Sequence, residues 1–446
     1  MDKNLNPDKI YEDFKKNKIN KFETLKILES LINESDNEDI RAQAINLIGK
    51  LSLFNERISR IIEKSIITDE STLVKINAAK ISLRNNLDQT EKALDWLIEN
   101  EKSILFFKKM LDFTEQSQNP KLKIFHEKLL KKLEKIYNLN KQEARFILEL
   151  DYLDYEKFIE TFREFSSKFE IKETEKKKLF KENTEIGFKG LGRIKSIRER
   201  CITGLVLDGF DRLPKSLQCL SKLENLVIKR SKIGNLPDKY GYLSNLKNFV
   251  LQNNQIETIP KWVLTIASKD YYIKKYIKSG VNAKEVSLLG LLEILTGQAF
   301  IRLDLDVFPS HSLLFYYKIN KVGNITTLYL SSELSRIGIF PKELCKLKFL
   351  EEICMVNQNI RFIPECIGDL RNLKILNLNY NEISELPASI GNLEKLEYLC
   401  LRKDGGKLSI IPKNLVNLKN LKVLDLTGNT VENMPESIKS LDSLKI

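Results

Sequence analysis

The chain offers few residues of the types that carry out chemistry. It has two histidines, His126 and His311, far apart in the sequence. It contains no HExxH segment, no closely spaced histidine and cysteine ligands, and no acid–base pair at a defined motif. We therefore expect no enzymatic activity, no cofactor and no metal site. Both histidines are expected to be surface or capping residues.

Two further segments have suggestive spacings. In GFKGLGRIKS (187–196), Gly187 and Gly192 are separated as in a phosphate-binding loop, but Arg193 follows where a lysine is needed and no strand precedes. We interpret it as a flexible link. YYIKKYIK (271–278) interleaves aromatic and basic residues. It either stacks on bases or lies on a membrane, or it forms an amphipathic helix whose tyrosines pack on the protein itself.

The composition is that of a globular protein. Of 446 residues, 42% are hydrophobic and 30% are charged, which suggests two or three domains. The net charge of +12 is concentrated between residues 101 and 300, where both signs are interspersed. This favours solvated helix faces and leaves contact with nucleic acid or a membrane as the alternative. The N-terminus lacks a signal-peptide core, no apolar stretch predicts a transmembrane segment, and the six cysteines form no CxxC pair. We expect a cytoplasmic protein with reduced thiols.

An internal sequence repeat predicts the secondary structure of the C-terminal half, and with it the residues that could form a site. From residue 202 onward the pattern LxxLxLxxNxIxxLPxxIxxLxxL recurs, and most copies start 23 residues apart. The copies begin at Leu246, Leu373 and Leu421, and less regularly at Ile202, Leu223, Ile325, Leu350 and Leu396.

Each position of the repeat has a physical role. The LxL pair alternates with period 2, so both leucines point to one face of a short strand. The asparagine can bond backbone groups in the following turn, and the LP step ends the strand because proline lacks an N–H. Stacked copies bury a continuous core that one copy alone cannot form. The pattern predicts an α/β solenoid of short parallel strands.

The variant PxxIGxLxxLxxLxLxxNxI, present as PECIGDLRNLKILNLNYNEI and PASIGNLEKLEYLCL, resembles leucine-rich repeats of the intracellular Ras-binding and Ras-suppressor-like class. The resemblance covers about half of the chain. It implies protein recognition in signal transduction, with a small GTPase as a candidate partner. The asparagine position departs from the pattern, which predicts less regular repeats, at Phe210, Ser231, Glu333, Gln358 and Asp404.

The repeats are interrupted by an apolar, helix-like segment. The approaches SIRERCITGLVL (196–207) and KINKVGNITTLYL (318–330) look alike, so we expect a capping hairpin before each of two repeat blocks. We favour two blocks in contact over one continuous horseshoe with a bulge. The expected division is 1–118 helical repeats, 119–195 helical bridge, 196–263 first hairpin and block, 264–316 insertion of two or three helices, and 317–446 second hairpin and block.

The N-terminal region is expected to be all-α, because it has almost no Gly or Pro and no strand-like alternation. A weak 34-residue repeat resembles HEAT or armadillo helix pairs. In it, Ile27, Leu28, Ile32, Ile40, Arg41 and Ala44 recur as Ile61, Ile62, Ile66, Val74, Lys75 and Ala78.

The repeat register predicts which side chains leave the core and form a docking face. The residue between the two core leucines, and its neighbours two positions away, point outward. In the second block these residues are Tyr329, Cys354, Val356, Ile375, Asn377, Asn379, Tyr380, Tyr398, Cys400, Arg402, Val423 and Asp425. Several are apolar, which suggests an interface. Strand propensity, or cover by another segment, would also explain them.

Two of these outward residues, Cys354 and Cys400, lie two strands apart. Strands are spaced by roughly 4.8 Å, so their Cα atoms should be too far apart for a disulfide. We expect two free thiols on this face. The function that follows is a non-enzymatic scaffold that binds a protein partner. The alternative is a nucleic-acid or membrane-surface adaptor that uses the basic middle region.

Overall fold

The computed structural model describes residues 6–85, 90–168, 193–303, 315–332, 335–403, 405–432, 434, 438 and 444–445. The chain divides into two compact units. One unit comprises Met1–Gly192 together with Glu199–Cys201, and the other comprises Arg193–Arg198 together with Ile202–Ile446.

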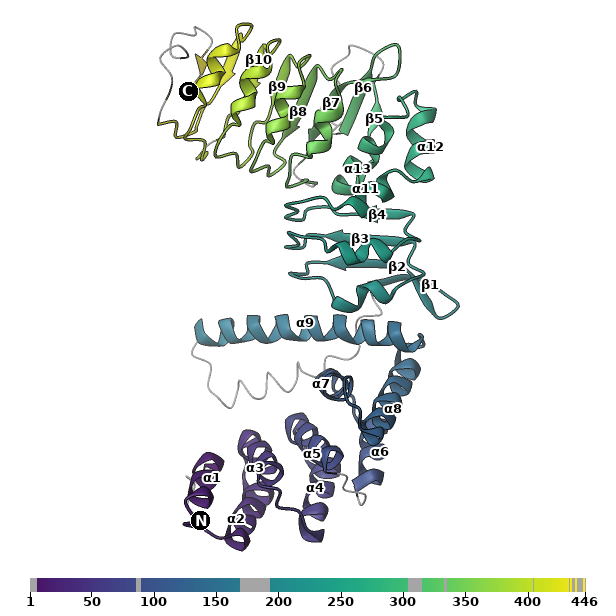
Figure 1. The fold of residues 1–446 in the computed structure, drawn as a ribbon, viewed down its shortest axis with the longest axis vertical. Coiled ribbons are helices and arrows are strands. Elements are labelled where there is room, and N and C mark those ends of the chain that lie inside the picture. Colours follow the sequence, from purple (N-terminus) through teal and green to yellow (C-terminus); the bar gives the residue numbers. More distant parts are fainter. Residues whose placement is uncertain are drawn as a thin grey trace. The chain divides into compact units, whose positions relative to one another are not determined.

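From residue 6 to residue 168, the described secondary structure of the first unit is helical (Figure 1). The helices are α1 (Pro7–Lys15), α2 (Lys21–Glu34), α3 (Glu38–Lys50), α4 (Glu56–Thr68), α5 (Thr72–Arg84), α6 (Glu91–Asn100), α7 (Ile104–Thr114), α8 (Pro120–Tyr137) and α9 (Lys141–Lys168). Local sequence explains most of the starts, because a short polar residue precedes the helix and its side chain accepts a hydrogen bond from a backbone N–H of the first turn. The residues that do so are Asn6, Asn20, Asn37, Asn55, Ser71, Ser103 and Asn119.

The helices of this unit pack in two layers. The odd-numbered helices contact one another in succession, α3 with α5, α5 with α7 and α7 with α9. The even-numbered helices do the same, α4 with α6 and α6 with α8. The apolar stripe of each helix is buried between the layers, as Leu28, Ile62 and Ala78 illustrate. This arrangement places equivalent residues of successive helix pairs side by side.

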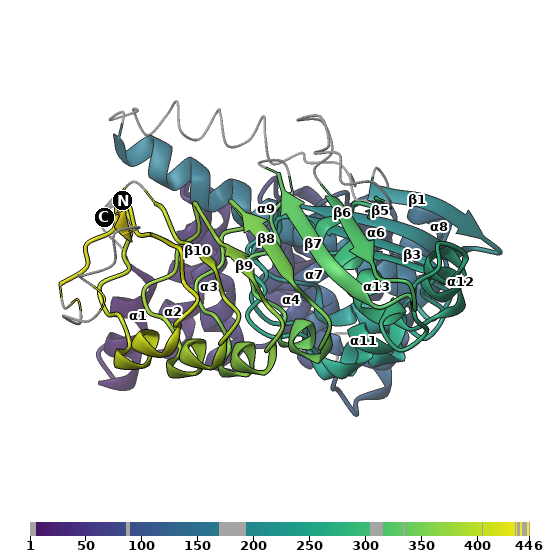
Figure 2. The ribbon, with the colours of Figure 1, turned by 90° about the horizontal axis from the view of Figure 1, so that it is seen from above.

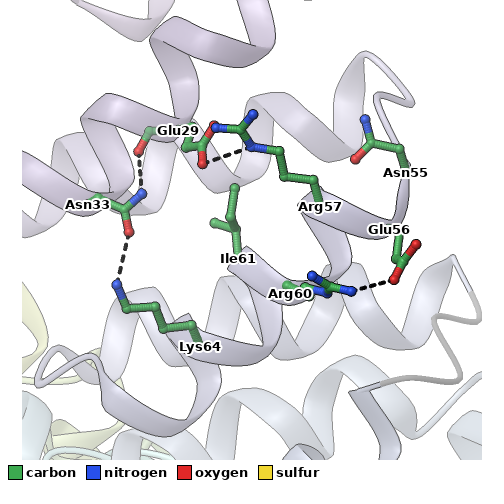
Figure 3. Close-up of a pocket in the computed structure, with 8 residues that line it drawn as sticks. All are labelled: Glu29, Asn33, Asn55, Glu56, Arg57, Arg60, Ile61 and Lys64. Carbon is green, nitrogen blue, oxygen red and sulfur yellow. Dashed lines mark hydrogen bonds and ion pairs between the residues drawn. The ribbon is translucent and has the colours of Figure 1, made fainter.

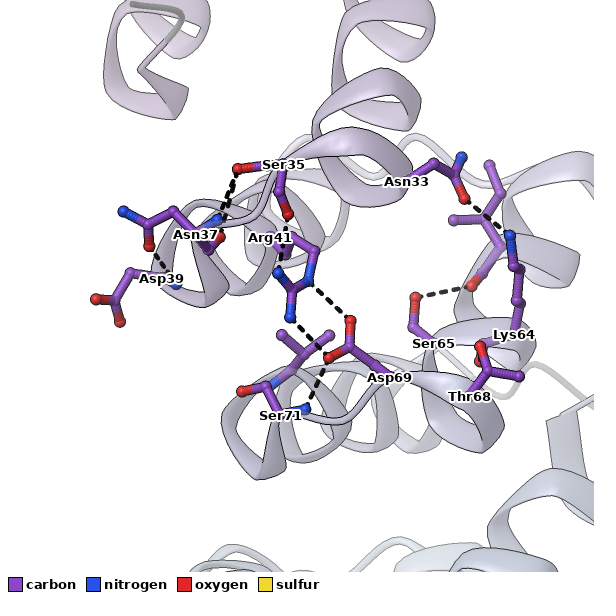
Figure 4. Close-up of polar contacts among 12 residues, drawn as sticks. Asn33, Ser35, Asn37, Asp39, Arg41, Lys64, Ser65, Thr68, Asp69 and Ser71 are labelled. Atoms are coloured by element: carbon purple, nitrogen blue, oxygen red, sulfur yellow. Dashed lines mark hydrogen bonds and ion pairs between the residues drawn. The ribbon is translucent and has the colours of Figure 1, made fainter. Parts of the chain in front are cut away.

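A ladder of ion pairs ties successive helix pairs together. Arg41 on α3 donates two hydrogen bonds to the carboxylate of Asp69, at 2.9 and 3.0 Å, and a third to the carbonyl of Ser35 at 2.9 Å (Figure 4). Asp69 also accepts from the backbone of Ser71, the residue that caps α5.

One repeat further on, Lys75 on α5 pairs with Glu101 at 3.2 Å, and Glu101 accepts from the backbone of Ser103, the residue that caps α7. The recurrence of Arg41 as Lys75 in the sequence therefore has a structural counterpart, in which both residues fasten their helix to the next loop.

The second unit contains two sheets. The first has the order β1-β2-β3-β4, made by β1 (Ile194–Arg198), β2 (Cys201–Asp208), β3 (Asn225–Lys229) and β4 (Asn248–Val250). The second sheet runs in order from β12 to β5, and its strands are β5 (Ile301–Arg302), β6 (Phe315–Ile319), β7 (Ile325–Ser331), β8 (Glu352–Val356), β9 (Ile375–Asn377), β10 (Tyr398–Cys400), β11 (Val423–Asp425) and β12 (Leu444–Lys445). Strands β7 to β12 are parallel, whereas β6 and β7 form an antiparallel hairpin.

Six of the repeats contribute one strand and one short 3-10 helix that begins after a proline, whereas Pro260 is followed by the α-helix Lys261–Ala267. The 3-10 helices stack in a row along one side of the strands (Figure 2). They are η3 (Lys215–Cys219), η4 (Asp238–Tyr242), η5 (Lys342–Lys346), η6 (Glu365–Asp369), η7 (Ala388–Asn392) and η8 (Lys413–Asn417). The core leucines of neighbouring strands are directly paired, as in Leu376 with Leu399, and both are fully buried.

The repeat asparagine has the role that its position predicts. The amide of Asn381 donates to the carbonyls of Met355 and Leu378, at 2.7 and 2.8 Å, and its oxygen accepts from the backbone N–H groups of Gln358 and Ile360. Asn381 is buried, so these bonds satisfy backbone groups that water cannot reach. At Ser231, which replaces the asparagine in another repeat, the shorter side chain accepts one of these hydrogen bonds, from the backbone N–H of Phe210.

The expectation of six reduced thiols is wrong for one pair of cysteines, because Cys345 and Cys366 form a disulfide with Cα atoms 5.8 Å apart. Cys345 stands at the position that Gly368 holds one repeat later. A Cβ on Gly368 would lie 2.6 Å from the carbonyl oxygen of Ser389, so adjacent 3-10 helices approach very closely there. Stacking of the repeats therefore brings the two cysteines together, although the sequence separates them by 21 positions.

The interruption between the repeats consists of helices α11 (Lys261–Ala267), α12 (Asp270–Lys278) and α13 (Val286–Thr296). Helix α13 packs against β4, and the backbone N–H of Leu251 bonds the carbonyl of Ile294 at 2.7 Å. The turns of the two repeat blocks also meet directly, because the backbone N–H of Arg336 bonds Asn253 Oδ1 at 2.7 Å. The two sheets are thus joined both through the helices and through their turns.

Candidate interaction face of the repeats

The strand register brings most of the predicted outward residues into two rows. Tyr329, Cys354, Asn377, Cys400 and Asp425 are directly paired from β7 to β11. Because paired residues of a parallel sheet lie on the same face, these side chains form one continuous row.

The second row runs beside the first. Ile375, Tyr398 and Val423 are directly paired, and Glu352 extends the row onto β8. The side chains of both rows are partly or fully exposed, with Tyr398 at 37%, whereas the leucines between them are fully buried. We refer to these two rows together as the outward face.

The remaining predicted residues lie at the ends of the strands. Val356 is paired with Ser331 at the end of β8. Asn379 and Tyr380 follow β9 and bond the backbone of Arg402, Asn379 through its side-chain oxygen at 2.8 Å and Tyr380 through its backbone N–H at 2.7 Å. These residues border the outward face at the turn that leaves the strands.

Sequence reasoning missed one aromatic residue of this face. Tyr316 on β6 is paired with Tyr329, and their rings stack with centroids 4.6 Å apart and planes 11° apart. The hairpin β6–β7 was predicted as a cap, and the alternation within FYYKI (315–319) could have placed Tyr316 beside Tyr329.

The aromatic end of the face is uncharged at neutral pH. Burial raises the pKa of the Tyr316 phenol to about 12, with the Tyr329 phenol as a second cause. Burial also raises the pKa of the Cys354 thiol to about 12 and raises the pKa of Tyr329. Cys354 and Cys400 are not joined by a disulfide, as the strand spacing predicts. The face therefore offers apolar and aromatic contact area, bordered by Arg402 and Glu352.

The outward face of the first block is partly covered. A Cβ on Gly297, the residue that ends α13, would lie 2.9 Å from Cγ1 of Val250. The C-terminal end of α13 thus lies against the outward side chains of β4. The second block has the larger described area for a partner.

The basic and aromatic segment 271–278 forms helix α12 and packs onto the protein. Tyr272 and Tyr276 are 1% exposed, and the Tyr276 hydroxyl donates to Glu293 at 2.6 Å. Lys275 pairs with the same carboxylate at 2.7 Å. Burial, followed by the charge of Glu293, raises the pKa of Tyr276. These contacts correspond to the amphipathic-helix interpretation rather than to a free base-stacking surface.

The other chemical candidates are accounted for or lie outside the described residues. His126 bonds Thr114 Oγ1 at 2.8 Å, and burial lowers its pKa, which fits a structural residue. His311 and the glycines at 187–192 are outside the described residues. No cluster of three or more His, Cys, Asp or Glu side chains that could hold a metal occurs among the residues with described positions.

A hollow of about 710 Å³ lies between α2 and α4 (Figure 3). Its two arginines are paired with carboxylates, since Arg57 contacts Glu29 at 2.6 Å and Arg60 contacts Glu56 at 2.5 Å. Lys64 donates to the amide oxygen of Asn33 at 3.3 Å. The four charges of the ion pairs therefore balance one another.

Comparison with known proteins agrees with the repeat geometry. The model of the leucine-rich repeat family matches residues 372–393, which contain β9 and η7. This chain contains leucine-rich repeats. Such repeats generally mediate protein–protein interaction and generally have no enzymatic activity. Among the described residues, no helix is both long and apolar enough to cross a membrane.

A relative of known function matches part of this chain. The chain is 36% identical over 95 residues to the volume-regulated anion channel subunit LRRC8A of Homo sapiens, a match that covers 21% of this chain and 11% of that protein. The chain thus spans about a tenth of this relative's length.

Similar solved structures include a leucine-rich-repeat protein of Leptospira interrogans, at 25% identity, 55% coverage of this chain, 60% of that chain and a TM-score of 0.24. An internalin of Listeria monocytogenes has 17% identity, 58% and 92% coverage, and a TM-score of 0.24. TM-scores this low support no inference about function.

Proposed function

We propose that this protein is a non-enzymatic scaffold that binds a protein partner on the outward face of the second repeat block, which forms a solenoid with the rest of the second unit. The observation that carries this proposal is the pair of side-chain rows across β7 to β11. Tyr329, Ile375, Tyr398 and Val423 give the rows apolar area. Asn377 lies in the middle of the first row, and the carboxylates of Asp425 and Glu352 lie at the ends of the two rows. Protein interfaces have this composition.

The helical region extends the scaffold. Its helix pairs and the Arg41–Asp69 ladder support a HEAT-like repeat array, which would present a second binding surface in the same chain. A small GTPase is the first signalling partner to test, and that suggestion rests only on the resemblance to Ras-suppressor-like repeats.

A cytoplasmic location is likewise a proposal. The Cys345–Cys366 disulfide weighs against it, because disulfides are uncommon in reducing compartments. Measuring whether Cys345 and Cys366 are oxidised or reduced in source cells would test the cytoplasmic location.

The test uses the full chain as bait in an extract of the source organism, with quantitative mass spectrometry of what is retained. Ile375→Lys and Tyr398→Glu introduce charge at the centre of the outward face, and a genuine partner should be lost from both variants by roughly tenfold or more. The matched control is Val416→Lys, which changes an exposed apolar residue on η8, away from the outward face.

Partners retained equally by all three variants, or lost equally from all three, would contradict the proposed face. Circular dichroism of each variant separates loss of binding from loss of fold.

A further inference from the structure

A cleft of about 610 Å³ lies between the inserted helices and the first 3-10 helix of the second block. Its walls come from α11 and α13, from the turn at 282–285, and from η5 with the residues that follow it. Figure 1 shows α11 and α13 next to β4, at the junction between the two sheets. Small-molecule sites commonly have volumes of about 300–1,000 Å³ and occur at such junctions. The cleft is separate from the outward face.

The acidic wall of the cleft is Glu343 on η5. In each later repeat the residue at this position faces the preceding repeat, as Cys366 does when it bonds Cys345. For Glu343 the preceding element is the inserted helices, so its side chain faces the cleft that they line. Glu343 is only 8% exposed, and its Oε2 atom is buried without a hydrogen-bond partner among the described residues.

A buried carboxylate oxygen without a donor is unfavourable, because it has lost its hydrogen bonds to water and no protein donor replaces them. The carboxylate of Glu285, which also lines the cleft, already has a hydrogen-bond donor, because it accepts from the backbone N–H of Ile325 at 2.6 Å. Glu285 is part-buried, and this burial raises its pKa. A donor supplied to Glu343 would therefore bind in a weakly screened environment.

The floor of the cleft is apolar and its rim is basic. Leu288 and Leu291 of α13 line the floor, and Phe349, which is 49% exposed, stands at the mouth. Lys284 and Lys346 lie at the rim and are exposed, and neither ammonium group has an ion-pair partner among the described residues. A third lysine of the rim, Lys348, pairs with Asp369 at 3.3 Å.

We propose that this cleft binds a short apolar peptide with free termini, of about two or three residues. Its ammonium group donates to Glu343, its apolar side chains lie on Leu288, Leu291 and Phe349, and its carboxylate contacts Lys284 and Lys346. The cleft thus offers a carboxylate to the ammonium group of the ligand, apolar side chains to its apolar part, and ammonium groups to its carboxylate. A ligand that carries only one of the two charges would leave Glu343 or the rim lysines without a counterpart.

The experiment is isothermal titration calorimetry on the full chain with three probes, which are the dipeptide Leu-Leu, its N-acetyl derivative and its C-terminal amide. We expect Leu-Leu to bind. N-acetylation should weaken binding roughly tenfold or more, because it removes the charge-assisted bond to Glu343. Amidation should weaken it less and should reduce its dependence on salt, because the rim lysines are exposed.

Variants locate the binding. Glu343→Gln should weaken Leu-Leu binding roughly tenfold or more while leaving the N-acetyl derivative unaffected. Glu365→Gln is the control, since Glu365 is an exposed carboxylate on the neighbouring helix η6. Lys346→Glu changes an exposed residue and keeps the test available should Glu343→Gln unfold the protein, and it should weaken Leu-Leu binding several-fold.

Three outcomes would overturn the proposal. One is no binding of Leu-Leu at millimolar concentration, a second is equal binding of Leu-Leu and its N-acetyl derivative, and a third is an equal effect of Glu343→Gln and Glu365→Gln. Because no substitution lies on the outward face, the result is independent of the partner proposed for that face.

Discussion

At the scale of single residues, position in the repeat decides what a side chain does. Asn381 is buried and satisfies four backbone groups, whereas Asn377, only four positions earlier, points outward and accepts from the backbone of Asn379. The same contrast separates the cysteines. Cys354 lies on the outward face, whereas Cys345 is buried between 3-10 helices and bonded to Cys366.

The thiol of Cys354 should react slowly in the folded protein. Its pKa is raised to about 12 because burial disfavours the thiolate, which is the reactive form. At pH 8 we expect alkylation at least about a hundredfold slower than in the denatured protein, where the thiol pKa returns to about 8.5. The rate in the folded protein should rise as pH approaches 12.

Iodoacetamide labelling followed by peptide mass spectrometry measures the rate at each cysteine separately. The protein in guanidinium chloride serves as the control. Equal rates for Cys354 in the folded and denatured protein would contradict the burial of its thiol.

At the scale of elements, the stability of both regions depends on links between consecutive repeats. In the helical unit, the side chains of Arg41 and Asp69 are 16% and 11% exposed. Arg57 and Glu29 are also 28 positions apart and ion-paired, but the Arg57 side chain is 69% exposed (Figure 3). Both pairs join opposite charges, but only the Arg41–Asp69 pair is largely buried. We therefore expect the Arg41–Asp69 pair to contribute more to stability than the Arg57–Glu29 pair.

Replacing Arg41 by Ala should lower the free energy of unfolding by about 3 kcal/mol, because it leaves the Asp69 carboxylate buried without its partner. Replacing Arg57 by Ala should change the free energy by less than about 1 kcal/mol. Urea unfolding followed by circular dichroism measures both values. Similar losses in the two variants would show that the Arg41 pair is not buried as described.

The link between η5 and η6 is covalent. A disulfide that closes a loop of this length is expected to stabilise the protein by about 3 kcal/mol, because it restricts the unfolded chain. Cys345→Ser should therefore lower the melting temperature, and a reductant should lower that of the original protein but not that of the variant. Cys219→Ser, which changes a thiol on η3, is the control.

Peptide mapping of protein prepared without reductant should recover Cys345 and Cys366 as one linked peptide. Recovery of both as alkylated thiols would be evidence against the bond.

At the scale of the whole molecule, many basic residues with described positions lie next to a carboxylate. Several basic residues of both units are paired with nearby carboxylates, among them Lys132 with Glu99 and Lys374 with Glu351. On helix α12, Lys275 is paired with Glu293, and Lys274 contacts Asp270 at 3.1 Å. This distribution argues against a dedicated polyanion surface at residues 271–278.

Replacing Lys274 and Lys278 by Gln should lower the salt concentration that elutes the protein from heparin by no more than replacing Lys413 and Lys419, two exposed lysines of the second block. Both changes remove two positive charges, and a general attraction depends only on that number. A clearly larger shift for the Lys274 and Lys278 pair would favour the nucleic-acid or membrane-surface function.

The sequence by itself determined the repeats, the direction of their side chains and the helical character of the N-terminal region. These features are periodic, and periodicity follows directly from strand and helix geometry. The roles of Asn381 and of Ile353 and Met355 on either side of Cys354 could be derived in this way. Tyr316 could not be assigned with the same ease, because it belongs to the hairpin and not to the repeat.

Only the tertiary structure decided which residues meet when they do not occupy equivalent positions of the sequence repeat. The pairing of Cys345 with Cys366 requires the close approach of two 3-10 helices, which the 23-residue repeat does not specify for residues 21 apart. The burial of Tyr276 and the isolation of Glu343 depend on where three inserted helices pack against neighbouring repeats. Such packing is set by side-chain shape across elements distant in the chain, which is information that a local pattern does not contain.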